Sequence, residues 1–217
     1  MTCIFVPSKK AKTAEKSPIK YRTLFSSKAF ILIFTTLLFR CLPYWMFLGM
    51  SSIIYVEALG VDLAHYGYYQ GTWSLVFALG SVIAGVYVPR FQSKIILRLS
   101  AYISLLSLIA IVLVTLSDSK SPLLIATTFI VLSIAGIIPC IIVYPLLVSF
   151  FPEAKGKVAS LFLTLRLILT AICIQLAGYF YTGSFKSVGV IISLIIVPVV
   201  ITSFMMANNK EILAKLE

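Results

Sequence analysis

Residues 123–150 read LLIATTFIVLSIAGIIPCIIVYPLLVSF, and this stretch contains no acidic, basic or histidine side chain. An α-helix rises 1.5 Å per residue, so about 20 apolar residues cross the ~30 Å hydrocarbon core of a bilayer. This run is long enough to span a membrane as a helix. A strand of a transmembrane barrel would instead show about 10 residues of alternating polarity, a pattern that the sequence does not have.

Five further apolar runs share this character, and breaks of a few polar residues separate them. We expect six membrane-spanning helices, at approximately residues 30–56, 66–88, 95–116, 123–150, 158–181 and 188–206. Such short breaks favour tight turns between antiparallel helices. The sequence therefore predicts an all-α membrane protein. It consists of a tail over residues 1–28, a six-helix bundle over residues 29–207 and a C-terminal tail over residues 208–217.

The whole-chain composition agrees with this fold class. Hydrophobic residues make up 60% of the chain, charged residues only 12%, and the mean hydropathy is +1.07. A soluble domain usually carries about 25% charged residues. A soluble protein this apolar would expose more hydrocarbon than water tolerates, so the lipid bilayer is the expected surrounding.

The basic residues predict the orientation of the bundle. Lys and Arg number seven in residues 1–28, three in 90–98, two in 155–157 and two in 210–215, whereas the opposite side carries only Lys120 and Lys186. Because cytoplasmic loops are enriched in Lys and Arg, we expect both termini in the cytoplasm. The net charge of +11 is then explained by the basic residues on the cytoplasmic side, which are also attracted to anionic lipid headgroups. We therefore expect no nucleic-acid partner.

Two basic residues, Arg40 and Arg166, lie deep inside predicted spans. A centred Arg costs about 2.5–3.5 kcal/mol on insertion scales, so such a residue usually faces the bundle interior or a water-filled cavity. With Tyr44 one turn after Arg40, and with Gln175, they are candidates for a substrate cavity. A structural hydrogen bond to a neighbouring helix is the equally weighted alternative for each arginine.

Groups that support catalysis or metal binding are absent from the predicted spans. The seven acidic residues lie in tails, in breaks or at span ends, and the single histidine is His65 at the end of a span. The four cysteines are isolated and show no zinc spacing. No metalloprotease, hydrolase or nucleotide-binding motif occurs. We therefore expect no enzyme, no cofactor, no metal and no intramembrane proton relay.

The polar break after the second predicted span carries a family resemblance. Gly85-Val-Tyr-Val-Pro-Arg90-Phe-Gln-Ser-Lys94 resembles a degenerate copy of the G-x-x-x-D-R-x-G-R-R signature of the major facilitator superfamily. Gly85, Arg90 and Lys94 hold the first glycine, the first arginine and the last basic position. Pro89 replaces the aspartate and Gln92 replaces the second glycine, and these departures weaken the charge-relay role that the signature has in the family.

Three more passages resemble one group within that superfamily, the drug/proton antiporters of the bicyclomycin-resistance (Bcr/CflA) group. They are Phe151-Pro-Glu-Ala-Lys-Gly-Lys-Val-Ala-Ser160, Phe47-Leu-Gly-Met-Ser-Ser52 with Glu57 and Gly60, and Tyr66-Gly-Tyr-Tyr-Gln-Gly71. The resemblance covers residues 20–207 and is to the C-terminal six-helix half of a twelve-helix fold, in which each half is an inverted pair of three-helix units. It implies that residues 1–28 correspond to the linker between halves.

The resemblance implies a multi-pass half-transporter in the bacterial inner membrane. It would export drugs or other small amphipathic compounds by alternating access. The proton-coupling arginine and the antiporter signature helix belong to the other half in this group, so we expect a partner, either a separately encoded N-terminal half or a second copy. The alternative is a non-transporting product, either a truncated gene remnant or a membrane interaction protein.

Overall fold

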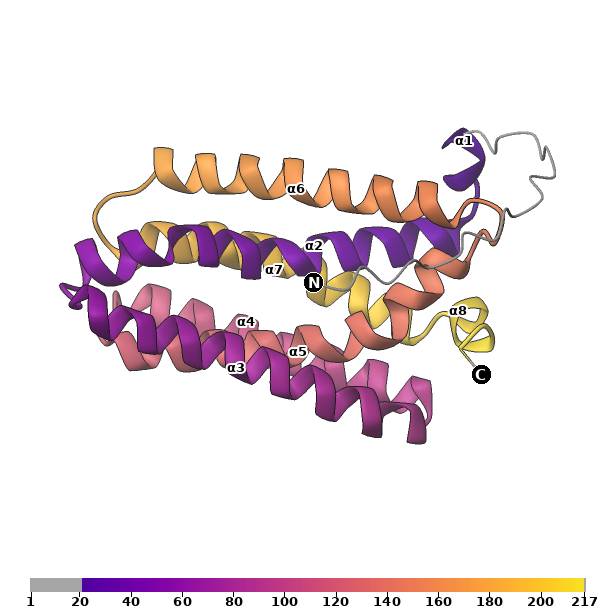
Figure 1. The fold of residues 1–217 in the computed structure, drawn as a ribbon, viewed down its shortest axis with the longest axis horizontal. Coiled ribbons are helices and arrows are strands. Elements are labelled where there is room, and N and C mark those ends of the chain that lie inside the picture. The colour runs from indigo at the N-terminus through magenta and orange to yellow at the C-terminus, as the bar shows by residue number, and fades with distance from the viewer. Residues whose placement is uncertain (1–20, 217) are drawn as a thin grey trace, which may run out of the picture.

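The computed structural model describes residues 21–216 of the 217-residue chain, so residues 1–20 of the predicted tail lie outside the described part. The described residues form helices and no strand (Figure 1), and helix accounts for 85% of the structure. The elements are α1 (Tyr21–Leu24), α2 (Lys28–Ser52), η1 (Ile53–Ala58), α3 (Leu63–Tyr87), η2 (Val88–Arg90), α4 (Ser93–Leu116), α5 (Pro122–Ser149), α6 (Lys155–Tyr179), α7 (Phe185–Ala207) and α8 (Lys210–Ala214).

Six of these helices are long and apolar enough to cross a membrane, which confirms the predicted fold class. The first span is α2 continued by the π-helix η1, and the others are α3 to α7. Each begins and ends within one helical turn of its predicted range. The short helix α8 was not predicted; it lies in the expected C-terminal tail and buries Ile212.

The polar breaks start helices because their side chains cap free backbone N–H groups. Ser27 accepts from the N–H of Phe30 at 3.3 Å, and Asp62 accepts from the N–H of Ala64 at 3.1 Å. Ser121 caps α5, whose first residue is a proline that has no N–H to satisfy. Such caps typically stabilise a helix by about 1 kcal/mol, so they fix where the apolar runs turn back.

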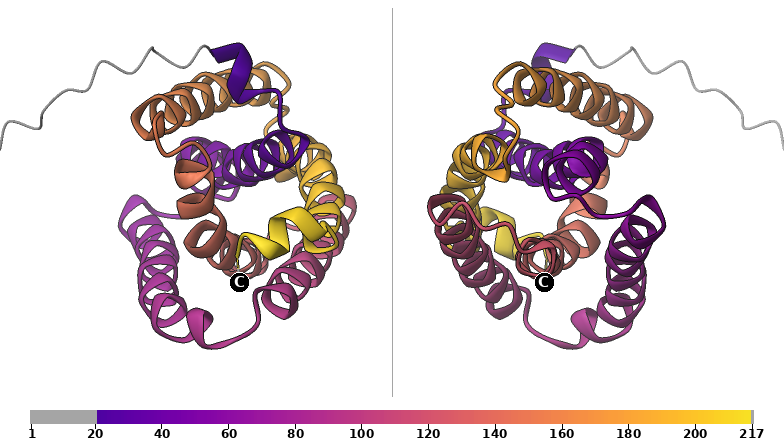
Figure 2. Two further views of the ribbon diagram at one scale, coloured as in Figure 1. Left: turned by 90° about the vertical axis from the view of Figure 1, so that its right-hand side faces the viewer. Right: turned by 90° about the vertical axis from the view of Figure 1, so that its left-hand side faces the viewer.

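The six spans form two interleaved three-helix units. In the first unit (α2, α3, α4) and the second (α5, α6, α7), the middle helix packs on the first helix of the other unit: α6 lies on α2, and α3 lies on α5. The first helices contact each other, and α4 and α7 form the largest helix pair. Viewed along the helices, α2 and α5 lie between α6 and α3, which sit at the two outer edges of one side (Figure 2).

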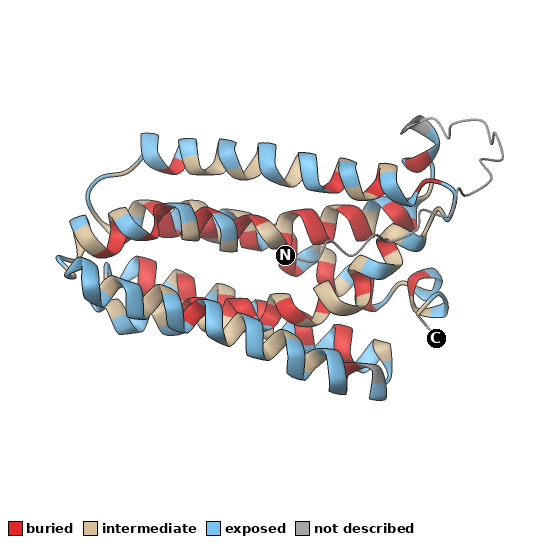
Figure 3. Ribbon diagram, in the orientation of Figure 1, coloured by how far each residue is buried: buried red, intermediate tan, exposed pale blue. Residues whose placement is uncertain are grey.

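The outside of the bundle is apolar, as expected for a surface in lipid. On α3 only Trp73 is buried, and the exposed side chains include Leu75, Leu79, Val82 and Ile83. Helix α6 is similarly uncovered, whereas α2 is buried along much of its length (Figure 3). The apolar core therefore centres on α2, and the two outer helices α3 and α6 bury little of their surface.

The close approach of α4 and α7 depends on Gly189. A Cβ atom built at this position would overlap the hydroxyl of Thr115 on α4 and lie 3.1 Å from the ring of Phe185. We expect Gly189→Val to destabilise the purified protein by about 1–3 kcal/mol, the usual cost of overpacking. Thermal unfolding in detergent measures this effect.

Gly178→Val on α6 is the matched control, because a Cβ at Gly178 meets nothing within 4 Å. Both substitutions place the same β-branched residue in a helix, so the helix propensity cost is shared. Equal melting temperatures for the two variants would contradict the assigned packing.

Candidate functional site

A cavity of about 390 Å³ lies within the bundle, between the two interleaved units. Helices α2, α3, α5, α6 and α7 all contribute to its wall. The lining residues are Arg40, Cys41, Pro43, Tyr44, Trp45, Phe77, Leu132, Ser133, Gly136, Cys140, Arg166, Ile196 and Val199. Three of the four sequence-predicted cavity residues, Arg40, Tyr44 and Arg166, are thus brought together at one site.

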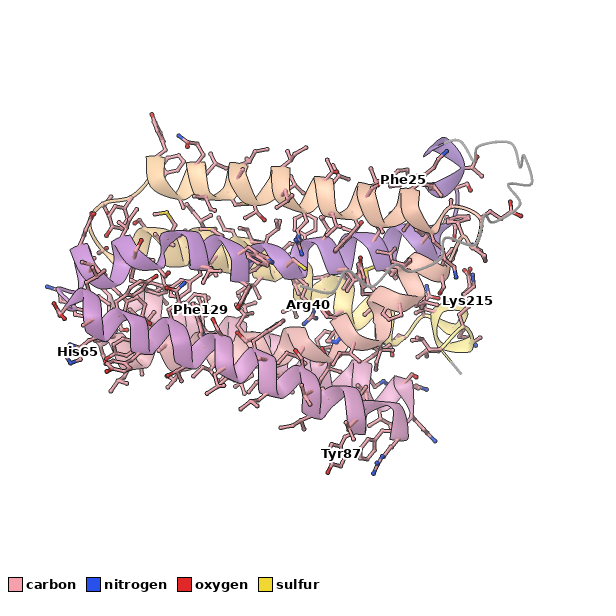
Figure 4. All side chains as sticks on the ribbon, in the orientation of Figure 1. Phe25, Arg40, His65, Tyr87, Phe129 and Lys215 are labelled. Atoms are coloured by element: carbon pink, nitrogen blue, oxygen red, sulfur yellow. The ribbon has the colours of Figure 1, made fainter. Side chains whose placement is uncertain are left out.

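Arg40 is buried, with only 7% of its surface exposed. It lies about 18 Å along α2 from Lys28 at 1.5 Å per residue, near the middle of the bundle's length (Figure 4). Its Nη1 donates to Oγ of Ser104 at 3.1 Å and to the carbonyl of Ala135 at 2.6 Å, and its Nη2 donates to Oγ of Ser203 at 2.5 Å. One guanidinium therefore connects α2 to α4, α5 and α7.

The acceptor on α5 exists because of a proline one turn later. Pro139 has no N–H, so the carbonyl of Ala135, four residues earlier, loses its partner within the helix. The freed oxygen accepts from Arg40 and also from Oγ of Ser100 at 3.0 Å. Membrane bundles tolerate intramembrane prolines where neighbours satisfy the freed backbone in this way.

The two serines are also prepared as acceptors. Oγ of Ser104 donates its proton to the carbonyl of Ser100 at 2.7 Å, and Oγ of Ser203 donates to the carbonyl of Val199 at 2.5 Å. Because each hydroxyl proton is held by the serine's own helix, a lone pair of each oxygen faces Arg40. The Nε of Arg40 is buried and has no hydrogen-bond partner among the described residues.

Arg166 is bound differently. It is half-buried on α6 and makes no hydrogen bond within residues 21–216. Its guanidinium carbon lies 5.2 Å from the ring centroid of Trp45 on α2, a cation–π contact worth about 0.5–1 kcal/mol at a partly exposed site. The hydrogen bonds of Arg40 therefore hold four helices together. Arg166 lines the cavity, and its N–H groups make no hydrogen bond with the described residues.

One wall of the cavity is aromatic. The ring of Tyr44 lies 5.7 Å from Trp45, 6.0 Å from Trp73 and 5.4 Å from Phe77, measured between centroids. This group continues into the buried pair of Phe47 and Phe129 through Trp73. The cavity thus offers flat apolar surfaces beside two cationic groups.

Gln175, the fourth predicted residue, is exposed on α6 and does not line the cavity. It follows Arg166 by nine positions, and at 3.6 residues per turn this spacing is two and a half turns. The two side chains therefore leave α6 on opposite faces, whereas Tyr44, one turn after Arg40, shares the face of Arg40.

The three residues of the degenerate loop signature lie outside the cavity, at the α3–α4 connection. Gly85 is exposed near the end of α3, and a Cβ there would meet nothing within 4 Å. Arg90 lies 5.3 Å from the ring centroid of Tyr87, and Lys94 is exposed in the first turn of α4. The structure brings them to one end of the bundle, and their assignment to a degenerate loop signature stays a prediction.

Sequence reasoning missed the partners of Arg40 and two lining cysteines. Cys41 follows Arg40 on α2, Cys140 lies on α5, and both line the cavity. The signal for Ala135 was present in the sequence, because a proline inside a span frees the carbonyl four residues before it. Nothing in the sequence identifies which arginine reaches that carbonyl.

Six apolar helices around a mid-depth cavity define a multi-pass membrane protein. The profile of the Major Facilitator Superfamily matches residues 4–173, so the chain belongs to that superfamily. It is therefore a membrane transporter of the major facilitator type. A search of the curated proteins gave no match, and a search of the solved structures gave none either.

Proposed function

We propose that this chain is one half of an exporter of small amphipathic compounds that works by alternating access. The observation that carries the proposal is the cavity of about 390 Å³ at mid-depth, lined by aromatic, apolar and cationic side chains. Ligand pockets usually have volumes of about 300–1,000 Å³ and apolar walls with a few polar groups. Major facilitator transporters bind substrate near the bilayer midplane, the level of Arg40 and Arg166.

The uncovered helices support the requirement for a second six-helix half. Helices α3 and α6 stand at the edges of the side where α2 and α5 lie, and they bury little surface. Arg166 on α6 is half-buried without a hydrogen-bond partner in the described chain. A guanidinium on a cavity wall that lipid rather than protein or water filled would lack partners, which is costly. A separately encoded half or a second copy that covers this side would remove that cost.

From the resemblance to the drug/proton antiporters we further propose that transport is outward and that protons are the coupling ion. Among residues 21–216, the cavity wall contains no carboxylate and no histidine. Proton relays in membrane bundles use such groups. If transport is coupled to protons, the titrating group must come from the second half. The proposed location is the bacterial inner membrane.

Dye efflux from cells tests the proposal. Cells that express this chain together with a matching six-helix half are expected to export a fluorescent amphipathic dye, and cells that express the chain alone are expected to export less. Efflux equal to that of the empty vector in both cases would overturn the transport function and favour a gene remnant or a membrane interaction protein.

The proposed orientation has its own test. Both ends of the described chain lie at one end of the bundle, and the α3–α4 and α5–α6 connections lie there too (Figure 1). A green fluorescent protein fused to the C-terminus is expected to fluoresce, because that fusion would remain cytoplasmic. Alkaline phosphatase inserted at Ser119, between α4 and α5, is expected to be active. The reverse pattern would place the termini outside.

A further inference from the structure

Two positive charges face the cavity, and no negative charge within the described chain balances them. Among the described residues that line the cavity, only Arg40 and Arg166 are charged at neutral pH. The described carboxylates lie at helix ends or in connections, at Glu57, Asp62, Asp118, Glu153 and Glu211. Glu57, in η1 at the end of the first span, lies about 25 Å along that span from Arg40 at 1.5 Å per residue.

The contacts of Arg40 leave its charge uncompensated. Its three acceptors are two serine hydroxyls and one backbone carbonyl, all of which are neutral. Its buried Nε has no partner within residues 21–216. An isolated charge in a weakly polar interior is costly, and a nearby opposite charge interacts far more strongly there than in water. An anion in the cavity would therefore be stabilised by the positive charge of Arg40.

The other lining residues and the volume of the cavity indicate how large and how apolar that anion is. Tyr44, Trp45 and Phe77 present aromatic surfaces, and Leu132, Ile196 and Val199 present aliphatic ones. A volume of about 390 Å³ far exceeds that of a single inorganic ion. The half-buried guanidinium of Arg166 retains donors that match a carboxylate, sulfonate or phosphate group.

We propose that the cavity binds an amphipathic organic anion, with its acidic group at Arg166 within the field of Arg40 and its apolar body against Tyr44, Trp45 and Phe77. This inference rests on the proposed transport function for its biological meaning. It concerns binding alone, so it is testable without transport.

Cys140 provides a built-in probe, because its thiol lines the same cavity as Arg40 and Arg166. The test uses the full chain, purified in detergent, with Cys3, Cys41 and Cys173 replaced by serine so that Cys140 is the only thiol. Two methanethiosulfonates of similar size are compared: the anionic 2-sulfonatoethyl reagent and the cationic 2-(trimethylammonium)ethyl reagent. Each rate is divided by the rate of the same reagent with free 2-mercaptoethanol, which removes the intrinsic difference between the two reagents. The reactivity of the Cys140 thiol cancels because both corrected rates refer to that thiol.

The anionic reagent is expected to react about threefold to tenfold faster after this correction, the size of effect that unit charges several ångströms apart produce in a partly hydrated site. Arg166→Gln is expected to reduce the preference, and Arg166→Lys is expected to keep it. Arg40 is left unchanged, because its substitution disturbs the bundle. A ratio of one or below, a ratio insensitive to Arg166→Gln, or no reaction with either reagent would overturn the proposal.

Protection of Cys140 tests the amphipathic body. Naphthalene-1-sulfonate is expected to slow labelling, and 1-naphthylmethylammonium, of similar size and opposite charge, is expected not to. Equal protection by both, or by neither, would refute selection for an organic anion. If phosphatidylglycerol protects the thiol and naphthalene-1-sulfonate adds nothing, the occupant is a lipid headgroup and the proposal fails. Charge preference without dye efflux in cells would keep this inference and reject the transport function.

Discussion

Arg40→Ala is expected to lower the melting temperature of the purified protein by about 10 °C. Three hydrogen bonds from a charged donor to α4, α5 and α7 are lost, each worth about 1.5–3 kcal/mol. Removing the charge relieves only about 2.5–3.5 kcal/mol of insertion cost. The hydrogen bonds outweigh that relief, and 1 kcal/mol corresponds to roughly 2–4 °C in a chain of this size. Differential scanning fluorimetry in detergent measures the shift.

A second substitution, at Pro139, provides a control for this prediction, because Pro139 leaves the carbonyl of Ala135 free to accept from Arg40. Pro139→Ala restores an N–H to α5, so the carbonyl of Ala135 regains a partner within the helix. Arg40→Ala is then expected to cost less in the Pro139→Ala background, with a coupling of about 0.5–3 kcal/mol. Strict additivity of the two substitutions would contradict the proline-linked role of Arg40.

Arg166→Ala is expected to have the opposite profile, with little effect on stability and at least a tenfold loss of the efflux that a second half restores. Its one described contact is the cation–π pair with Trp45, worth about 0.5–1 kcal/mol, so the melting temperature should change by no more than about 4 °C. Loss of a charge-assisted contact to a bound substrate, worth about 1.5–3 kcal/mol, corresponds to roughly tenfold or more. Dye efflux and thermal unfolding, measured on the same variant, separate the two effects.

Lys186→Ala is the matched charge control, because it removes one cation from an exposed position at the start of α7, far from the cavity wall. Efflux is expected to be unchanged in this variant. Unchanged efflux in Arg166→Ala would remove Arg166 from the site, and a large loss of stability would assign it a structural role like that of Arg40.

The number of spans and the two deep arginines were predictable because lipid imposes a simple rule. A span must be apolar over about 20 residues, and a charge inside it must face protein or water. Tyr44 was predictable from its spacing to Arg40 on one helix. Gln175 was not correctly placed, because two and a half turns separate its face from that of Arg166.

The contacts between helices could not be predicted from the sequence. Ser104, Ala135 and Ser203 lie on three helices other than that of Arg40. Which of many serines meets the guanidinium depends on the interleaving of the two three-helix units. Phe77 and Cys140 line the cavity for the same reason, since α3 and α5 pack side by side.

The bond between Arg40 and Ser203 joins residues 163 positions apart. At a synthesis rate of roughly 5–20 residues per second, the ribosome needs about 8–33 s to make Ser203 after Arg40. For all of this interval, the nascent first span carries a cation whose final partner has not been made. The full set of Arg40 contacts, from α4 through α5 to α7, is therefore complete only once the last span has been made.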